Sequence, residues 1–175
     1  MTGGRIDTDR PFVPLGIAVL TISDSRNKAD DSADPLAERI AGAGHVLRAR
    51  ALVRDDKAAI QAQARAWIDD PTVEVIVTTG GTGLTGKDVS PEAFRELFDK
   101  ELEGFTVLWH LISYETVGVS TMQSRACAGV AGKTAIYVLP GSLGACRDGW
   151  DKLISRQLDS RHRPCSIVEI VKPLR

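Results

Sequence analysis

The sequence lacks the patterns that mark several common classes of protein. It has three cysteines in 175 residues and no C-x-x-C pair, so neither a zinc site nor a disulfide framework is expected. Lys and Arg number 22 against 23 for Asp and Glu, a net charge of -1. No global positive charge therefore draws the chain to nucleic acid or to a membrane surface.

Long apolar runs are also missing. No run approaches the roughly 18 residues of a membrane span, and the first residues lack the apolar core of an export signal. We therefore expect a cytoplasmic protein. The three histidines have no metal-ligand spacing, and the three tryptophans fall in helical segments where burial explains them, so neither residue type enters the candidate site.

What the chain does contain is an alternation of apolar runs with helical patterns, which is typical of βαβ units and a mainly parallel sheet. Its length suits one domain with a real core, which we assign to residues 15–175, after an N-terminal extension of residues 1–14. The expected strands are 15–22, 46–53, 73–79 and 133–139. The expected helices are about 34–44, 58–68, 91–101, 105–116 and 143–157.

A glycine-rich loop follows the third expected strand. The segment from Val75 reads Val-Ile-Val-Thr-Thr-Gly-Gly-Thr-Gly-Leu-Thr-Gly-Lys-Asp-Val-Ser-Pro-Glu-Ala. Four glycines allow close backbone approach, and Ser90 followed by Pro91 is a typical helix start. Backbone amides arranged in this way bind phosphate groups.

Three other interpretations of this loop are open on the pattern alone. Gly81, Gly83 and Gly86 satisfy the dinucleotide-binding pattern G-x-G-x-x-G, but the segment from Lys87 to Ser90 separates them from the helix. The first seven positions of a P-loop also fit, but Asp88 stands where that motif needs Ser or Thr. The third interpretation is a loop whose glycines only permit a tight turn.

Acidic residues follow three of the expected strands. Asp24 comes after the first, Asp55 after the second, and Asp88 lies in the glycine loop after the third. Ligands of open α/β sheets bind at the carboxyl ends of the strands, so these carboxylates are expected to meet at one edge. Mg²⁺ takes one or two carboxylates together with water and substrate phosphates. Taken singly, Asp55 is equally well explained as a helix cap and Asp24 as a turn residue.

Across about residues 15–166 the chain resembles the molybdopterin adenylyltransferase family, which includes the G domain of gephyrin. The most specific part of the resemblance is Thr-Thr-Gly-Gly-Thr-Gly followed by Asp-Val-Ser-Pro-Glu-Ala. Further matches are Ala66-Trp67-Ile68, Glu103-Gly104-Phe105, Gln123-Ser124-Arg125-Ala126, Gly141-Ser142, Gln157-Leu158-Asp159 and Arg163-Pro164-Cys165. The resemblance implies a three-layer αβα fold of the molybdopterin-binding-domain type.

The resemblance also implies a reaction in molybdenum cofactor biosynthesis. Mg²⁺ and ATP adenylylate molybdopterin, giving adenylylated molybdopterin and pyrophosphate. It assigns catalysis and Mg²⁺ binding to Asp55 and Asp88. The expected substrate-binding residues are Asp24, Thr79, Gly80, Gly81, Thr82, Gly83, Ser124, Arg125, Pro140, Gly141 and Ser142.

Two points are open at this stage. The first is whether the chain turns over or is a catalytically silent carrier that binds molybdopterin. The second is the role of two site residues, because without the resemblance Arg125 is better explained as an ion-pair partner and Ser142 as a helix N-cap. The resemblance further implies a homotrimer or homohexamer, with other molybdenum cofactor biosynthesis proteins as candidate partners and no nucleic acid or membrane partner.

Overall fold

The structure, a computed structural model, describes residues 4–25 and 34–172. Within these ranges, one sheet has six strands in the order β3-β2-β4-β7-β6-β5. Four of them run parallel, while β6 lies antiparallel to β7 and β5 antiparallel to β6. The strands are β2 (Gly16–Ile22), β3 (Val46–Val53), β4 (Val75–Thr79), β5 (Lys100–Glu101), β6 (Cys127–Ala131) and β7 (Thr134–Leu139). The prediction of a mainly parallel α/β sheet is confirmed.

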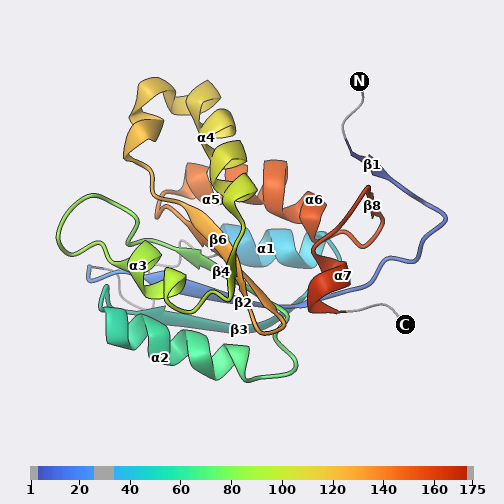
Figure 1. Ribbon diagram of the computed structural model, residues 1–175, viewed down its shortest axis with the longest axis horizontal. Helices are drawn as coiled ribbons and strands as arrows, with labels where there is room; N and C mark the ends of the chain where they lie inside the picture. Colours follow the sequence, from blue (N-terminus) through green and yellow to red (C-terminus); the bar gives the residue numbers. More distant parts are fainter. Residues whose placement is uncertain (1–3, 26–33, 173–175) are drawn as a thin grey trace.

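Helices cover both faces of this sheet (Figure 1). One face packs against α1 (Asp34–Gly42), α4 (Glu103–Val117), and a continuous helical stretch made of α5 (Leu143–Gly149), a π-helical segment (Trp150–Ile154) and α6 (Ser155–Gln157). The short α7 (Val168–Val171) joins the same core. The other face packs against α2 (Lys57–Ile68) and α3 (Ser90–Arg95). The three-layer αβα arrangement is confirmed.

Burial explains the strand order. Every residue of β2, β4 and β7 is buried, as expected for near-continuous apolar strands at the centre of a parallel sheet. By contrast, β3 lies at the edge, and its residues alternate between exposed and half-buried over its first six positions. The sequence pattern thus places the most apolar strands in the middle of the sheet.

One expectation between residues 91 and 131 was wrong, and one strand was missed. The helix expected over 91–101 ends at Arg95, and Lys100–Glu101 form β5 instead. The amide of Asp99 donates to Val130 O (2.8 Å) and that of Leu102 to Ala128 O (2.7 Å), so backbone bonds with β6 hold this segment at the sheet edge. The strand β6 itself was not anticipated.

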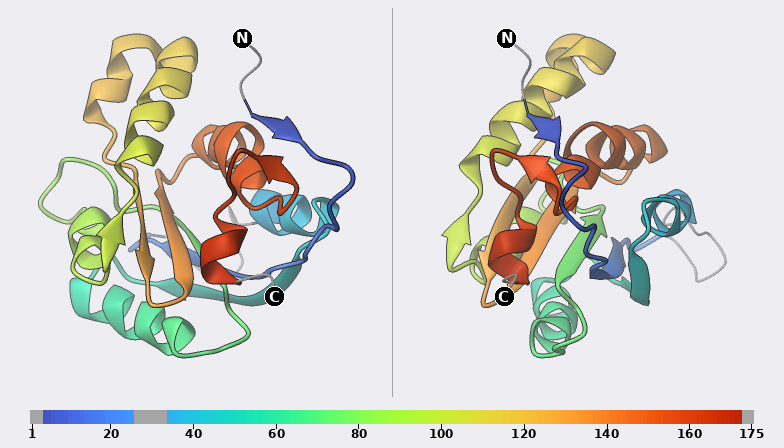
Figure 2. Two further views of the ribbon diagram at one scale, coloured as in Figure 1. Left: turned by 45° about the vertical axis from the view of Figure 1, so that its right-hand side comes forward. Right: turned by 90° about the vertical axis from the view of Figure 1, so that its right-hand side faces the viewer.

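The first residues are tied to the end of the chain. β1 (Arg5–Ile6) pairs antiparallel with β8 (His162–Arg163), and the two lie side by side in Figures 1 and 2. The buried hydroxyl of Ser160 donates to Pro11 O and accepts from the Val13 amide, both at 2.9 Å. Treating residues 1–14 as an extension stays a prediction. No helix in the described part of the chain is long and apolar enough to span a membrane.

Candidate functional site

The carboxyl ends of the parallel strands meet at one edge of the sheet. The register pairs Thr21 with Thr79 and Thr79 with Leu139, and Ile22 with Val53. The segments that follow these strands therefore leave the sheet together. They bring Asp24, Asp55, the glycine loop and Pro140-Gly141-Ser142 to the same place, as the sequence predicts.

The glycine loop begins with two residues in the left-handed region. Gly80 has φ 105° and Gly81 has φ 66°, conformations that cost other residues about 1–2 kcal/mol. A Cβ on Gly80 would lie 2.1 Å from Ile22 O, and one on Gly81 would lie 2.2 Å from Ser90 Oγ and 2.8 Å from the Asp55 carboxylate oxygens. The backbone at these positions has room for hydrogen but not for a side chain.

Asp55 is placed by the loop and not by a helix cap. Asp56 is the N-cap of α2, since its Oδ1 accepts from the Ala59 amide at 2.8 Å. Asp55 Oδ1 instead accepts from the Val89 amide (3.2 Å), and the Asp55 amide donates to Asp24 Oδ1 (3.1 Å). Desolvation, and then the charges of Asp88 and Asp24, raise the pKa of the Asp55 carboxyl.

Asp88 has the opposite environment. Its Oδ2 accepts from the hydroxyl of Thr85 and from the Thr85 amide (3.0 Å). The hydroxyl bond is the main reason that the pKa of Asp88 is lowered, with further backbone bonds from Thr85 and Gly83 acting in the same direction. The surroundings thus destabilise the ionised form of Asp55 and stabilise the ionised form of Asp88.

These residues fit a magnesium ion shared with phosphates. Among the described residues, no group of three or more His, Cys, Asp or Glu side chains stands close enough to hold a metal by itself. Burial is the main cause of the raised pKa of Asp55, and the negative charges of Asp88 and Asp24 raise it further. A hard divalent cation relieves such repulsion and needs only one or two protein carboxylates when phosphates supply the remaining oxygens.

Arg125 supports the glycine loop. Its Nε donates to Gly83 O (2.9 Å) and Thr82 O (3.3 Å), and its Nη2 donates to Asp88 O (2.8 Å). Nη1 is hydrogen-bonded to the Glu92 carboxylate. The ion pair that the sequence alone favoured is therefore present, and the same guanidinium also fixes the loop through three backbone carbonyls.

Two cavities share Thr82 and Gly83 as a common wall. The first, of about 450 Å³, is the acidic compartment, lined by Asp24, Asp55, Asp88, Lys87 and the loop backbone from Gly80 to Gly83. The second, of about 340 Å³, is the α4 compartment, lying between α4, the 3₁₀ segment Gly118–Gln123 and α5. Its lining is rich in hydroxyl groups and contains Trp109.

The remaining predicted residues divide between these compartments. Gly141 lines the acidic compartment, while Ser124, Pro140 and Ser142 line the α4 compartment. Ser142 is also the N-cap of α5, accepting from the Ala145 amide (3.2 Å).

Thr79 is placed differently. Its side chain is fully buried, donates to Pro140 O (3.1 Å) and accepts from Cys146 Sγ (3.2 Å). It lines neither compartment, because those internal partners turn its hydroxyl into the core.

Several residues of the site were not anticipated. Trp109 was assigned to the core, yet its indole edge reaches the α4 compartment, where Nε1 donates to Ser124 Oγ (2.8 Å). Thr85, Glu92 and Asp148 were also missed. An acidic or hydroxyl residue on a helix or loop has no distinguishing local pattern, although Thr85 and Glu92 stand within four residues of the predicted Asp88.

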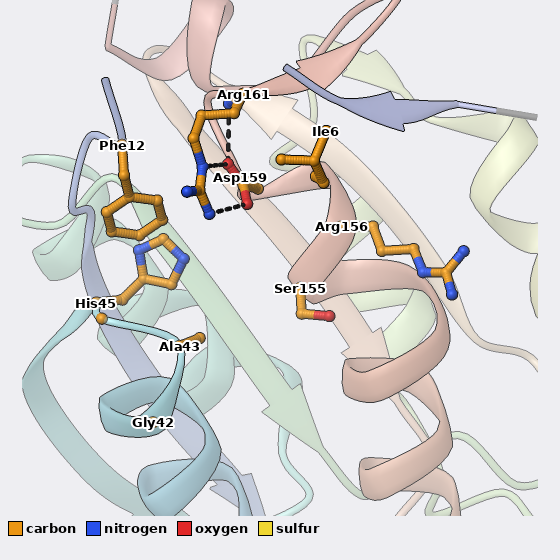
Figure 3. Close-up of a pocket in the computed structure, with 10 residues that line it drawn as sticks. Ile6, Phe12, Gly42, Ala43, His45, Ser155, Arg156, Asp159 and Arg161 are labelled. Carbon is orange, nitrogen blue, oxygen red and sulfur yellow. Dashed lines mark hydrogen bonds and ion pairs between the residues drawn. The ribbon is translucent and has the colours of Figure 1, made fainter. Parts of the chain in front are cut away.

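A further hollow of about 540 Å³ lies at the opposite, amino-terminal edge of β2 and β3, between Phe12, His45 and the helix end at Ser155 (Figure 3). There Asp159 binds Arg161 through two bonds of 2.9 and 3.0 Å, and the Arg161 guanidinium lies 5.4 Å from the Phe12 ring centre. Asp159 and Arg161 thus satisfy each other, His45 Nδ1 accepts from the Leu15 amide (3.2 Å), and none of the residues predicted for the site lines this hollow.

The chain is similar to proteins of one family. Residues 18–160 match the family described as "Probable molybdopterin binding domain". Molybdenum cofactor biosynthesis protein B of Escherichia coli (strain K12) is 48% identical over 156 residues, covering 89% of this chain and 92% of the relative.

Solved structures agree. A crystal structure of a molybdenum cofactor biosynthesis protein B superposes with a TM-score of 0.82 at 39% identity, covering 85% of this chain and 94% of the other. The molybdopterin biosynthesis enzyme MoaB from Thermus thermophilus gives a TM-score of 0.77 at 31% identity, covering 92% and 99%. These structures share the fold over nearly their whole lengths.

Proposed function

Because the chain belongs to the probable molybdopterin binding domain family and to its molybdenum cofactor biosynthesis protein B group, we propose that it acts in molybdenum cofactor biosynthesis as a molybdopterin adenylyltransferase. In the proposed reaction the terminal phosphate of molybdopterin attacks the α-phosphate of ATP. The phosphorus–oxygen bond to the leaving pyrophosphate breaks, and adenylylated molybdopterin is the product.

The observation that carries this proposal is the pair of compartments joined at the glycine loop. The acidic compartment suits the triphosphate of ATP, and the α4 compartment, with Trp109 and several hydroxyls, suits a flat polar heterocycle. The shared wall at Thr82 and Gly83 then receives the phosphate of molybdopterin. The loop then holds the acceptor phosphate next to the α-phosphate of the nucleotide. Direct transfer between them needs no covalent intermediate on the protein.

The chemistry needs positioning and charge neutralisation more than a nucleophilic side chain. Asp55 and Asp88 would hold a Mg²⁺ ion, which would neutralise charge on the phosphates. Gly80, Gly81, Thr82 and Gly83 offer backbone to the phosphates, with Asp24 holding the Asp55 segment in place. Arg125 holds the glycine loop in place by donating to the backbone carbonyls of Thr82, Gly83 and Asp88.

A catalytically silent molybdopterin carrier is the second candidate. The observation that favours it is the position of Asp88, whose carboxylate is bound by its own loop through Thr85. A carboxylate held in this way by its own loop has fewer lone pairs to offer a metal ion. Conversion of molybdopterin by the wild-type protein supports the transferase, whereas molybdopterin binding without any adenylylated product supports the carrier.

We also propose that the protein works in the cytoplasm as a homo-oligomer, a trimer or a pair of trimers. The support is a projecting apolar surface on α4 and the segment after it, which stand out from the body of the molecule (Figures 1 and 2). Its large apolar side chains are 51 to 81% exposed. They are Val107, Leu108, Leu111, Tyr114, Val117, Val119 and Met122. Large exposed apolar surfaces are rare on monomers, and a second copy of the chain would bury these side chains.

A further inference from the structure

The α4 compartment contains one ionisable side chain among the described residues that line it. This residue is Asp148 on α5, whose side chain is only 15% exposed. The other polar groups of the lining are hydroxyls, one glutamine side chain and backbone, and the apolar part includes Trp109 and Pro140. A single carboxylate in such a setting dominates the choice of ligand.

The Asp148 carboxylate is oriented but not saturated. Thr116 Oγ1 on α4 donates to Oδ2 at 3.2 Å. Two cations are nearby, with Arg147 Nε 3.5 Å from Oδ1 and Lys152 Nζ 3.6 Å from Oδ2, beyond the usual length of a charged hydrogen bond. A carboxylate accepts about four hydrogen bonds, so each oxygen keeps accepting capacity for a ligand.

The matching ligand group is a pair of parallel N–H donors. A 2-amino-4-oxopteridine presents such a pair, because its ring N3–H and its 2-amino group point the same way. They complement the two oxygens of a carboxylate as an arginine fork does. We propose that Asp148 determines specificity for the pterin ring by accepting these two donors, while Thr116 positions its carboxylate. This inference rests on the proposed function only in taking molybdopterin as the ligand.

The test compares two ring systems that differ at one position. Pterin carries the 2-amino group, and lumazine carries an oxygen there, whose lone pairs face the carboxylate. Equilibrium dialysis without ATP measures the binding of each. We expect the wild-type protein to prefer pterin by about tenfold or more, as for loss of a hydrogen bond to a charged group.

Three variants locate the effect. Asp148→Asn presents an amide that donates to the 2-oxygen, so its preference should vanish or reverse toward lumazine. Thr116→Val keeps the charge but loses the orienting bond, and its preference should be intermediate. Asp151→Asn is the matched control, since Asp151 lies three residues further along, pairs with Arg39 and does not line the compartment.

Each outcome decides the question. Wild-type protein that binds the two rings equally, or binds neither at millimolar concentration, overturns the inference, as does a pterin preference that survives in Asp148→Asn. A thermal melt confirms that each variant is folded. Failure of adenylyl transfer is a separate result, because ring selectivity is measured without nucleotide and holds equally for a carrier.

Discussion

Replacement of Gly81 by alanine tests the geometry of the glycine loop most sharply. The new methyl group would lie 2.2 Å from Ser90 Oγ and 2.8 Å from both carboxylate oxygens of Asp55. Both neighbours are anchored, because Ser90 Oγ donates to Gly80 O (2.8 Å) and Asp55 Oδ1 accepts from the Val89 amide. The substitution therefore displaces Asp55, Ser90 or the loop itself.

Two costs add in Gly81→Ala. A non-glycine residue at φ 66° costs about 1–2 kcal/mol, and overpacking a tight site costs about 1–3 kcal/mol. We therefore expect a loss of about 2–5 kcal/mol in the free energy of unfolding. At about 2–4 °C per kcal/mol for a chain of this size, the melting temperature should fall by roughly 4–20 °C.

Gly86→Ala is the matched control in the same loop. An added Cβ at Gly86 meets no atom within 4 Å, and its φ is not in the positive region. Thermal unfolding and binding of Mg²⁺ with ATP should both be close to wild type in Gly86→Ala and impaired in Gly81→Ala. Equal behaviour of the two variants would show that the left-handed backbone and tight packing at Gly81 are not needed for the loop.

Four further predictions concern the charges of the two aspartates, the support of the loop and the assembly. The raised pKa of Asp55 means that ionisation of this carboxyl at neutral pH opposes folding. In a thermal melt at neutral pH without metal, Asp55→Asn should therefore leave the melting temperature unchanged or raise it. A marked fall in the melting temperature would contradict this. The lowered pKa of Asp88 contributes stability above its unfolded pKa that is lost as pH falls through its folded pKa. Asp88→Asn should lower the free energy of unfolding by about 1 kcal/mol at neutral pH and reduce the loss of stability on acidification. A pH dependence of stability equal to that of the wild type would contradict this. Arg125→Lys keeps the charge but loses the planar guanidinium that reaches Gly83 O and Asp88 O. Nucleotide binding measured by calorimetry should therefore weaken about tenfold. Wild-type affinity in this variant would show that the contacts of Arg125 with the loop are dispensable. Leu111→Glu places a charge in the exposed α4 surface and should dissociate the oligomer in sedimentation velocity, whereas a wild-type monomer would remove the assembly proposal.

The position of the site could be predicted from the sequence because strand ends define it. Short apolar runs end at Ile22, Val53 and Thr79, and the residues that follow parallel strands necessarily meet at one edge. Asp24, Asp55 and the glycine loop are therefore brought together by topology alone. No knowledge of side-chain packing is needed for that step.

The strand β6 could not be predicted in the same way. Its residues Cys-Ala-Gly-Val-Ala lack both a β-branched run and an alternating pattern. It becomes a strand through pairing with β7 across a two-residue turn in which Gly132 has φ 59°. Tertiary pairing overrides weak local preference here, and the neighbouring β5 follows from it.

Side-chain roles were the least predictable feature. The sequence indicates that Arg125 and Ser124 belong to the site, but not that the guanidinium reaches three loop carbonyls while the serine accepts from Trp109. Thr79 shows the converse, since a hydroxyl next to the glycine loop turns into the core. Such contacts depend on rotamers that only the packed structure fixes.

The most direct test of the proposed function is turnover of molybdopterin with ATP and Mg²⁺ by the purified protein. Adenylylated molybdopterin and pyrophosphate are followed together, with Asp55→Asn and Asp88→Asn measured alongside. We expect both products in equal amounts from the wild type and a large loss in each variant. No product from wild-type protein that still binds molybdopterin would contradict the transferase and leave the carrier, with the glycine loop as a ligand cradle only.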